Sequence, residues 1–252
     1  LVVEEENGGN GTLAMVERGV EADAAVVLEP SELKIIPAVR GAIWFQLRVF
    51  GKATHSGNTE GRISAIDAAY QAIEILRSYH DRLLASSRHL PLFDEYADPM
   101  PLTIGQFESG TWPATVPDEA VLKGLIGFLP NKNRQEVQQD LEDALRTQGD
   151  DWLKDNFEIT FPMLRNDGNS LPTDHPLVLA LSASVVRTGL ASEIDAMRAA
   201  CDAWQYANKL EIPTVVFGPG SLGVAHSAEE HIPVEEIFQA ARVLADLVTT
   251  YP

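Results

Sequence analysis

The chain has 252 residues, 45% of them hydrophobic, which is enough for one large or two modest globular domains. Its formal net charge of -18 at pH 7 argues against nucleic acids and anionic membranes as partners, and suits a soluble cytoplasmic protein or one that binds cations. The single cysteine, Cys201, excludes an internal disulfide framework and a thiolate-rich zinc site, and no apolar run reaches the roughly 18 residues of a membrane span.

The chain opens with an apolar stretch, Leu1–Val3, which predicts a short strand; Glu4, Glu5, Glu6 and a glycine-rich loop follow. Three adjacent acids alone are usually a solvated turn. Here they would lie at the carboxyl end of a strand, where open α/β sheets bind ligands. Because successive strand side chains point to opposite faces, Glu5 and Glu6 could take different tasks, one holding a cation and the other moving a proton. A bound divalent cation would offset the repulsion among the carboxylates.

A helix is predicted from Thr12 to Gly19, and the apolar run 24–28 predicts a strand buried on both faces. Strand, helix and strand in this order indicate a βαβ unit. Glu29 follows the second strand. A solvated strand end is one interpretation of Glu29, but parallel neighbours would bring it to the same sheet edge as the first acids. The missing initial Met and the apolar start suggest the C-terminal portion of a longer protein.

The pattern changes from about Pro37. Residues 42–50 alternate with a period near two, which is typical of a half-buried strand in an antiparallel sheet. The further elements expected are a polar loop at 51–57, a helix at 64–84, strands at 102–107, 120–129 and 157–161, and a helix at 133–145 with Asn133 as its N-cap. The order β-α-β-β-α-β is the ferredoxin-like pattern, so we predict a separate inserted α+β domain over residues 37–162.

Residues 163–252 return to the α/β pattern after a linker rich in Pro, Asn, Asp and Gly. A helix is predicted over 177–188, a buried strand over 213–217 and a closing helix over 234–249; His226 follows the strand. The expected fold is therefore an α/β domain, residues 1–36 and 163–252, that carries the inserted domain. Strand-end carboxylates and one histidine are ligands that suit Zn²⁺, Mn²⁺ or Co²⁺.

An ordered set of motifs runs along the whole chain. It consists of Glu4-Glu5-Glu6-x-Gly8-Gly9-x-Gly11, Leu28-Glu29-Pro30-Ser31, Gly51-Lys52-Ala53-Thr54-His55-Ser56-Gly57, Val116-Pro117-Asp118, Cys201-Asp202-Ala203, and Gly218-Pro219-Gly220 with Ala225-His226-Ser227-x-x-Glu230. Each motif is weakly specific by itself, whereas the ordered set is strongly specific. The set resembles the M20 metallopeptidase and deacylase family, which includes acetylornithine deacetylase, succinyl-diaminopimelate desuccinylase, aminoacylase and glutamate carboxypeptidases.

The resemblance implies a zinc-peptidase-like α/β catalytic domain with an inserted ferredoxin-like dimerisation domain. It also implies two divalent metal ions, with zinc expected first and cobalt or manganese as alternatives. By this resemblance Glu5 is the general base that takes a proton from a water molecule. Glu6 and His226 are ligands of one ion, and Glu29 is a ligand of the other.

The same resemblance implies a homodimer formed through the inserted domain. His55 would reach the active site of the partner subunit and stabilise the oxyanion of the reaction. Asp202 and Arg165 are the candidates for binding the substrate, an N-acyl amino acid or a small peptide. The simpler interpretations are a turn acid for Asp202 and an ordinary linker arginine for Arg165.

Three positions depart from the family pattern. Ala114, Gly127 and Trp204 stand where members carry Asn, Arg and Arg, which weakens the comparison with the glutamate-specific members and the aminoacylases. The family also supplies a His and a bridging Asp ahead of the residue that matches Glu5, so we expect the chain alone to hold metal poorly and to have little or no activity. Two alternatives stay open: a metal-poor pseudoenzyme that binds a small metabolite, and a protein whose inserted domain serves mainly dimerisation.

Overall fold

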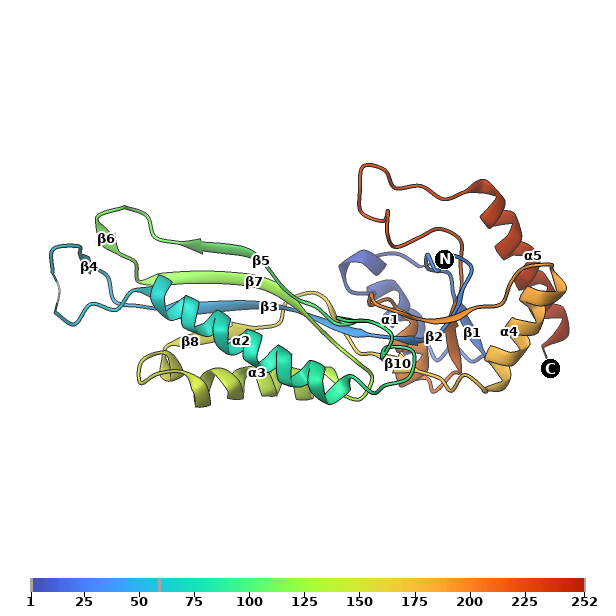
Figure 1. Ribbon diagram of the computed structural model, residues 1–252, viewed down its shortest axis with the longest axis horizontal. Helices are drawn as coiled ribbons and strands as arrows, with labels where there is room; N and C mark the ends of the chain where they lie inside the picture. The colour runs from blue at the N-terminus through green and yellow to red at the C-terminus, as the bar shows by residue number, and fades with distance from the viewer. Residues whose placement is uncertain (1, 59, 252) are drawn as a thin grey trace. The chain divides into compact units, whose positions relative to one another are not determined.

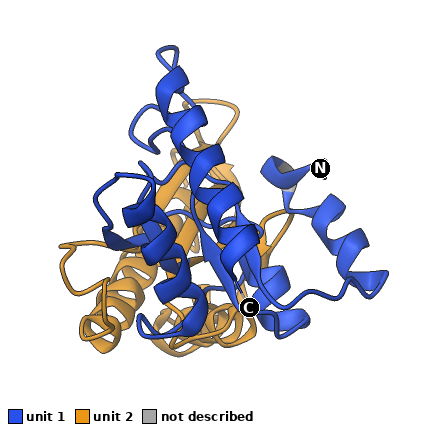
Figure 2. Ribbon diagram, turned by 90° about the vertical axis from the view of Figure 1, so that its right-hand side faces the viewer, with its two compact units in different colours: residues 1–40, 166–252 blue, residues 41–165 orange. Residues whose placement is uncertain are grey.

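The computed structural model describes residues 2–58 and 60–251 and has the mixed α/β fold predicted from the sequence. It divides into two compact units (Figure 2). The first comprises Leu1–Arg40 and Asn166–Pro252, and the second, Gly41–Arg165, is inserted in its chain. No helix in the described ranges is long and apolar enough to cross a membrane.

The first unit is built on a mixed sheet with helices around it (Figure 1). Its strands are β1 (Ala25–Val27), β2 (Ile35–Val39), β10 (Asn169–Ser170), β11 (Ile194–Met197) and β12 (Thr214–Val216). Strand β12 lies between β1, to which it is parallel, and β2, to which it is antiparallel; β10 and β11 also pair with β2. The helices are η1 (Glu5–Asn7), α1 (Asn10–Glu17), α4 (Pro176–Arg187), the π-helix η3 (Gln205–Lys209) and α5 (Val234–Thr250).

Neighbouring residues of β12 contribute to different cores, as the period-two geometry of a strand requires. Val215 packs with α4 and α5 in one cluster. Val216 packs in a second cluster that includes Cys201 and Ala203. The segment that carries Asp202 is therefore anchored through both of its sequence neighbours.

The second unit contains an antiparallel sheet in the order β5-β7-β3-β8, and β9 pairs with β3. Its strands are β3 (Gly41–Phe50), β4 (Thr54–His55), β5 (Leu102–Ser109), β6 (Thr115–Val116), β7 (Glu119–Phe128) and β8 (Phe157–Thr160), and β9 (Arg165–Asn166) closes it. The helices are α2 (Ala65–Ser87), α3 (Arg134–Gln148) and η2 (Leu153–Asp155). The order of these elements along the chain is the predicted ferredoxin-like one.

Helices α2 and α3 lie along one face of this sheet (Figure 1). The alternation predicted for β3 is confirmed, because Phe45 and Leu47 are buried while Trp44 is partly exposed. The predicted N-cap of α3 is also confirmed. Asn133 accepts a hydrogen bond from Glu136 N at 2.9 Å, and Glu136 accepts one from Asn133 N at 2.8 Å, which completes a capping box.

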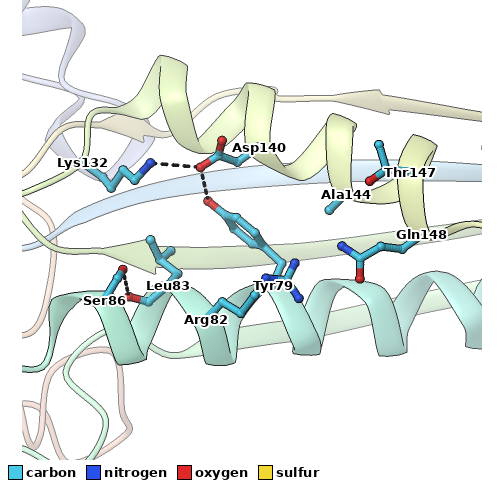
Figure 3. A pocket seen from close by; sticks show the side chains of 9 residues that line it. All are labelled: Tyr79, Arg82, Leu83, Ser86, Lys132, Asp140, Ala144, Thr147 and Gln148. Carbon is cyan, nitrogen blue, oxygen red and sulfur yellow. Dashed lines mark hydrogen bonds and ion pairs between the residues drawn. The ribbon is translucent and has the colours of Figure 1, made fainter.

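An open groove of about 450 Å³ lies between α2 and α3 (Figure 3). The Tyr79 hydroxyl donates a hydrogen bond of 3.2 Å to Asp140, which also pairs with Lys132 at 3.2 Å. Burial, followed by the charge of Asp140, raises the pKa of Tyr79 above its ordinary value. The lining contains one carboxylate and no histidine, so we interpret this cluster as a tie between the two helices.

The structure differs from the prediction at several short segments. Val2 and Val3 form no strand: Val3 is 71% exposed, and its carbonyl closes a loop by accepting a hydrogen bond from Gly11 N at 3.2 Å. Leu1 lies outside the described residues. The segment predicted as a loop around His55 contains β4, which pairs with β6, a short strand that the sequence did not predict. These strands and β11 are too short to show a periodic pattern in the sequence.

Candidate active site

Glu29 lies just beyond the carboxyl end of β1, next to the end of its parallel neighbour β12. Ser31 N and Leu33 N donate to Gly218 O at 3.3 and 3.1 Å, and Gly218 N donates to Ser31 Oγ at 3.0 Å. A Cβ at Gly218 would come to 2.5 Å from the Glu29 carbonyl oxygen, so this close approach requires glycine. The turn after β12 therefore fixes the main chain at Glu29.

Glu5 and Glu6 lie on η1, a single 3-10 turn, and not at the end of a strand. Glu4 and Gly8, which flank the turn, have φ angles of 64° and 110°, and Gly8 N and Gly9 N donate to Glu5 O and Glu4 O at 3.1 and 2.9 Å. With about three residues per turn, successive side chains diverge by roughly 120°. Glu5 is consequently half-buried and Glu6 exposed. The side chains of Glu5 and Glu6 therefore diverge as expected, but they do so because of a 3-10 turn and not because of the alternation of a strand.

The acids of these two turns interact electrostatically with one another. The pKa of Glu5 is raised from 4.5 to about 7, first by burial and then by the charges of Glu29, Asp202 and Glu6, while His226 acts in the opposite sense. The pKa of Glu29 is also raised from 4.5 to about 7, first by burial and then by Asp202 and Glu6. Glu5, Glu6, Glu29 and His226, here called the acid cluster, therefore lie near enough for the charge of each to act on others of the set, and the direct contact that the structure shows among these four residues is the one between Glu6 and His226. Such an excess of negative charge favours a bound cation.

His226 lies in the long segment between β12 and α5. Its Nε2 is 3.3 Å from both carboxylate oxygens of Glu6, and both side chains are exposed. The main chain of His226 has a φ of 59°, in the left-handed region that residues other than glycine seldom adopt. Its N–H donates to Glu230 Oε2 at 2.6 Å. Glu230 therefore holds the backbone that orients the imidazole.

Asp202 is buried, with 3% exposure. Its Oδ2 accepts from Thr12 Oγ1 at 2.5 Å, and its Oδ1 accepts from Gln205 Nε2 at 3.1 Å. The same amide nitrogen donates to Gly9 O at 2.9 Å. Sequence reasoning missed Thr12 and Gln205. For Thr12, the sequence offered one signal of a role in the site, a polar residue on the buried face of a predicted helix. For Gln205, the sequence offered no such signal.

His55 and Arg165 belong to the second unit. His55, on β4, is exposed, and its Nδ1 accepts a hydrogen bond from Gly57 N at 3.1 Å. In the neutral ring this leaves the proton on Nε2, which becomes a donor. Arg165, on β9, is exposed, and its carbonyl accepts from the Arg134 guanidinium at 2.9 Å.

The donor set of the acid cluster suits a divalent cation in chemical type, because it combines carboxylate oxygens with one imidazole. The number of donors, however, is smaller than a metal site requires. Within residues 2–58 and 60–251, no group of three His, Cys, Asp or Glu side chains is arranged to hold a metal ion. A catalytic zinc takes about three protein ligands, and the contact between Glu6 and His226 brings together two side chains of the kinds that zinc binds.

Comparisons with known proteins identify the second unit. Residues 38–152 match the peptidase dimerisation domain family. Over 271 aligned residues the chain is 28% identical to N-formyl-4-amino-5-aminomethyl-2-methylpyrimidine deformylase of Bacillus subtilis, covering 99% of this chain and 63% of the relative. It is 26% identical to acetylornithine deacetylase of Vibrio cholerae over 234 residues, covering 91% of this chain and 58% of the relative. The chain thus spans less than two thirds of either relative.

Solved structures share the fold of the chain. Aminopeptidase PepT from Bacillus cereus matches with a TM-score of 0.76 at 22% identity, covering 98% of this chain and 62% of that one. The M20 family metallo-carboxypeptidase Sso-CP2 from Sulfolobus solfataricus matches with a TM-score of 0.75 at 16% identity, covering 98% of this chain and 68% of that one. At these identities the likeness concerns the fold alone.

Proposed function

We propose that the chain belongs to the M20 family of hydrolases and that the protein containing it hydrolyses the amide bond of small N-acyl compounds with the help of divalent cations. The match of residues 38–152 to the peptidase dimerisation domain family and the two relatives, a deformylase and a deacetylase, support this proposal. The observation that carries this proposal is the cluster of Glu5, Glu6, Glu29 and His226. Burial and mutual repulsion raise the pKa of Glu5 and Glu29 to about 7, as expected of a site that awaits positive charge.

Each residue of the cluster receives a role in this proposal. Glu6 and His226 hold one cation and Glu29 holds a second; zinc is expected, with cobalt or manganese as alternatives. When bound, the cations activate a water molecule and polarise the amide carbonyl. Glu5 takes a proton from the attacking water and returns it to the leaving amine. A half-buried carboxyl with a raised pKa suits this exchange near neutral pH.

The second unit contributes to the proposed reaction through a homodimer. Strand β5 is at the edge of its sheet, and exposed edges pair readily with another chain. His55 donates its Nε2–H to the oxyanion in the partner's active site, where a preorganised donor contributes about 3–4 kcal/mol. Arg165 is the candidate for binding a substrate carboxylate. The cytoplasm is the expected compartment.

The names of the two curated relatives favour an N-acyl substrate over a peptide. One is a deformylase and the other a deacetylase. N-formyl and N-acetyl amines, including N-acyl amino acids, are therefore the first substrates to test, and small peptides are the second.

The test is Glu5→Gln in the natural full-length protein. We expect kcat for an N-acyl substrate to fall by about 10²–10⁴, because the variant keeps the shape of the side chain and loses its basicity. Glu17→Gln, an exposed change on α1, is the matched control and should leave the rate unchanged. A rate near the wild-type value for Glu5→Gln would end the general-base assignment. Absence of a tight zinc or manganese site in calorimetry would favour the pseudoenzyme alternative.

A further inference from the structure

We infer that Asp202 is a positioning residue, which clamps the turn carrying Glu5 and Glu6 through Thr12, Gln205 and Gly9. This role rests on the proposed function of that turn. It differs from the substrate contact expected from the family resemblance, and it adds Thr12 and Gln205 to the residues on which the site depends.

The Asp202 carboxylate is engaged by the protein on both oxygens. Thr12 Oγ1 donates to Oδ2 at 2.5 Å and Gln205 Nε2 donates to Oδ1 at 3.1 Å. The three residues are 1–3% exposed. An aspartate that is buried and hydrogen-bonded in this way offers little access to a substrate. It does connect α1, which directly follows the glutamate turn, to η3.

Gly9 is the point at which the clamp holds the turn. Its carbonyl accepts from Gln205 Nε2 at 2.9 Å, and its N–H donates to Glu4 O at 2.9 Å. Its φ is 72°, and a Cβ at this position would overlap Asp202 Oδ1 and Gln205 Nε2. The backbone of the turn is therefore pressed against the two clamp side chains, and only glycine fits between them.

The orientation of the Gln205 amide is determined by its two acceptors. Nε2 serves both Asp202 and Gly9, so a flipped amide would direct an oxygen at two other oxygens. In the described part of the chain, Gln205 Oε1 is buried and has no hydrogen-bond partner. An unsatisfied buried acceptor is destabilising, and a departure of this kind commonly marks a functional site. The location of Gln205 at the start of a π-helix agrees, since π-helices are frequent at functional sites.

The experiment compares Thr12→Val with Thr12→Ser in the natural full-length protein. Valine keeps the shape and removes the hydroxyl, whereas serine keeps the hydroxyl. We expect Thr12→Val to lower kcat by about 10- to 100-fold with little change in KM, because a small displacement of reacting groups has this effect. Thr12→Ser should restore the rate. Thr249→Val, an exposed change on α5, is the control for loss of a threonine hydroxyl.

A double variant separates the clamp from two unrelated contacts. If Thr12 acts through Asp202, Thr12→Val combined with Asp202→Asn should cost no more than the larger single effect. A rise in KM with unchanged kcat in Asp202→Asn would overturn the inference in favour of substrate binding. A lower Tm with unchanged kcat and KM in Thr12→Val would show that the contact is purely structural, and this result would also overturn the inference.

Amide hydrogen exchange distinguishes failure of the clamp from failure of the proposed function. In Thr12→Val, and not in Thr12→Ser, the amides of Gly8, Gly9 and Gly11 should exchange faster whether or not the protein is a hydrolase. Unchanged exchange at these amides would refute the clamp. An inactive wild-type protein with faster exchange in Thr12→Val would refute the proposed reaction and leave the clamp supported.

Discussion

The stability of the metal-free protein should fall between pH 5 and pH 8 because of Glu5 and Glu29. The pKa of each carboxyl rises from 4.5 to about 7 on folding, so the folded state binds these protons more tightly than the unfolded state. Their contribution to stability is fully present below pH 4.5 and is lost as the pH rises through about 7. This direction is opposite to that of carboxylates held in salt bridges.

The magnitude follows from the size of the shift. A rise of the pKa from 4.5 to about 7 corresponds to at most about 3.4 kcal/mol per carboxyl. Both side chains are only half-buried and their titrations overlap, so we expect about 2 kcal/mol for the two together. For 150–250 residues that unfold as one unit this amounts to a decrease in Tm of about 4–8 °C, and a longer protein that unfolds as one unit shows a smaller decrease. Because glutamine cannot ionise, the Glu29→Gln variant should show only about half of this decrease in Tm.

The assay is thermal unfolding of the chelator-treated full-length protein at pH 5 and pH 8, followed by circular dichroism. Wild type, Glu29→Gln and the exposed control Glu17→Gln are compared, so that titrations elsewhere in the protein cancel. Adding zinc at about 100 times its Kd should restore about 2.7 kcal/mol at pH 8. The reasoning is refuted if Glu29→Gln shows the same pH dependence as wild type and Glu17→Gln.

Three further predictions concern other parts of the chain. Mixing inactive His55→Ala and Glu5→Gln dimers under subunit exchange should recover about a quarter of the wild-type activity, since half of the dimers then contain one intact site; no recovery would exclude a role for His55 in the partner's site. Glu230→Ala should weaken zinc binding by about tenfold in calorimetry because the backbone of His226 loses its hydrogen bond of 2.6 Å; unchanged affinity would contradict this role. Tyr79→Phe should destabilise the second unit by about 1 kcal/mol in urea unfolding because the bond to Asp140 is lost, and the matched change at the exposed Tyr70 should have no effect; equal results for the two variants would contradict the helix tie.

The regular elements could be predicted because each carries a local pattern. From Ile43 to Phe50, strand β3 alternates buried residues with partly or fully exposed ones, and α2 is long and amphipathic. Asn133 with Glu136 marks the start of α3 through a capping box. The ferredoxin-like order followed from these elements, since it depends only on their type and sequence.

The local structure of the site could not be predicted from such sequence patterns. The 3-10 turn at Glu5 and Glu6 depends on positive φ angles at Glu4 and Gly8, and no strand pairs with Val3. Motifs pointed to the acids and to His226 but not to how the turn is held. The bond between Thr12 and Asp202 joins residues far apart in the chain, and no local pattern reports such a contact.

The most direct test of the account is anomalous diffraction from crystals of the natural full-length protein loaded with zinc. We predict peaks about 2.0–2.2 Å from carboxylate oxygens of Glu6 and Glu29 and from a ring nitrogen of His226, with Glu5 beside them and not coordinated. Zinc bound elsewhere, with Glu6, Glu29 and His226 all without a metal, would contradict the proposed active site.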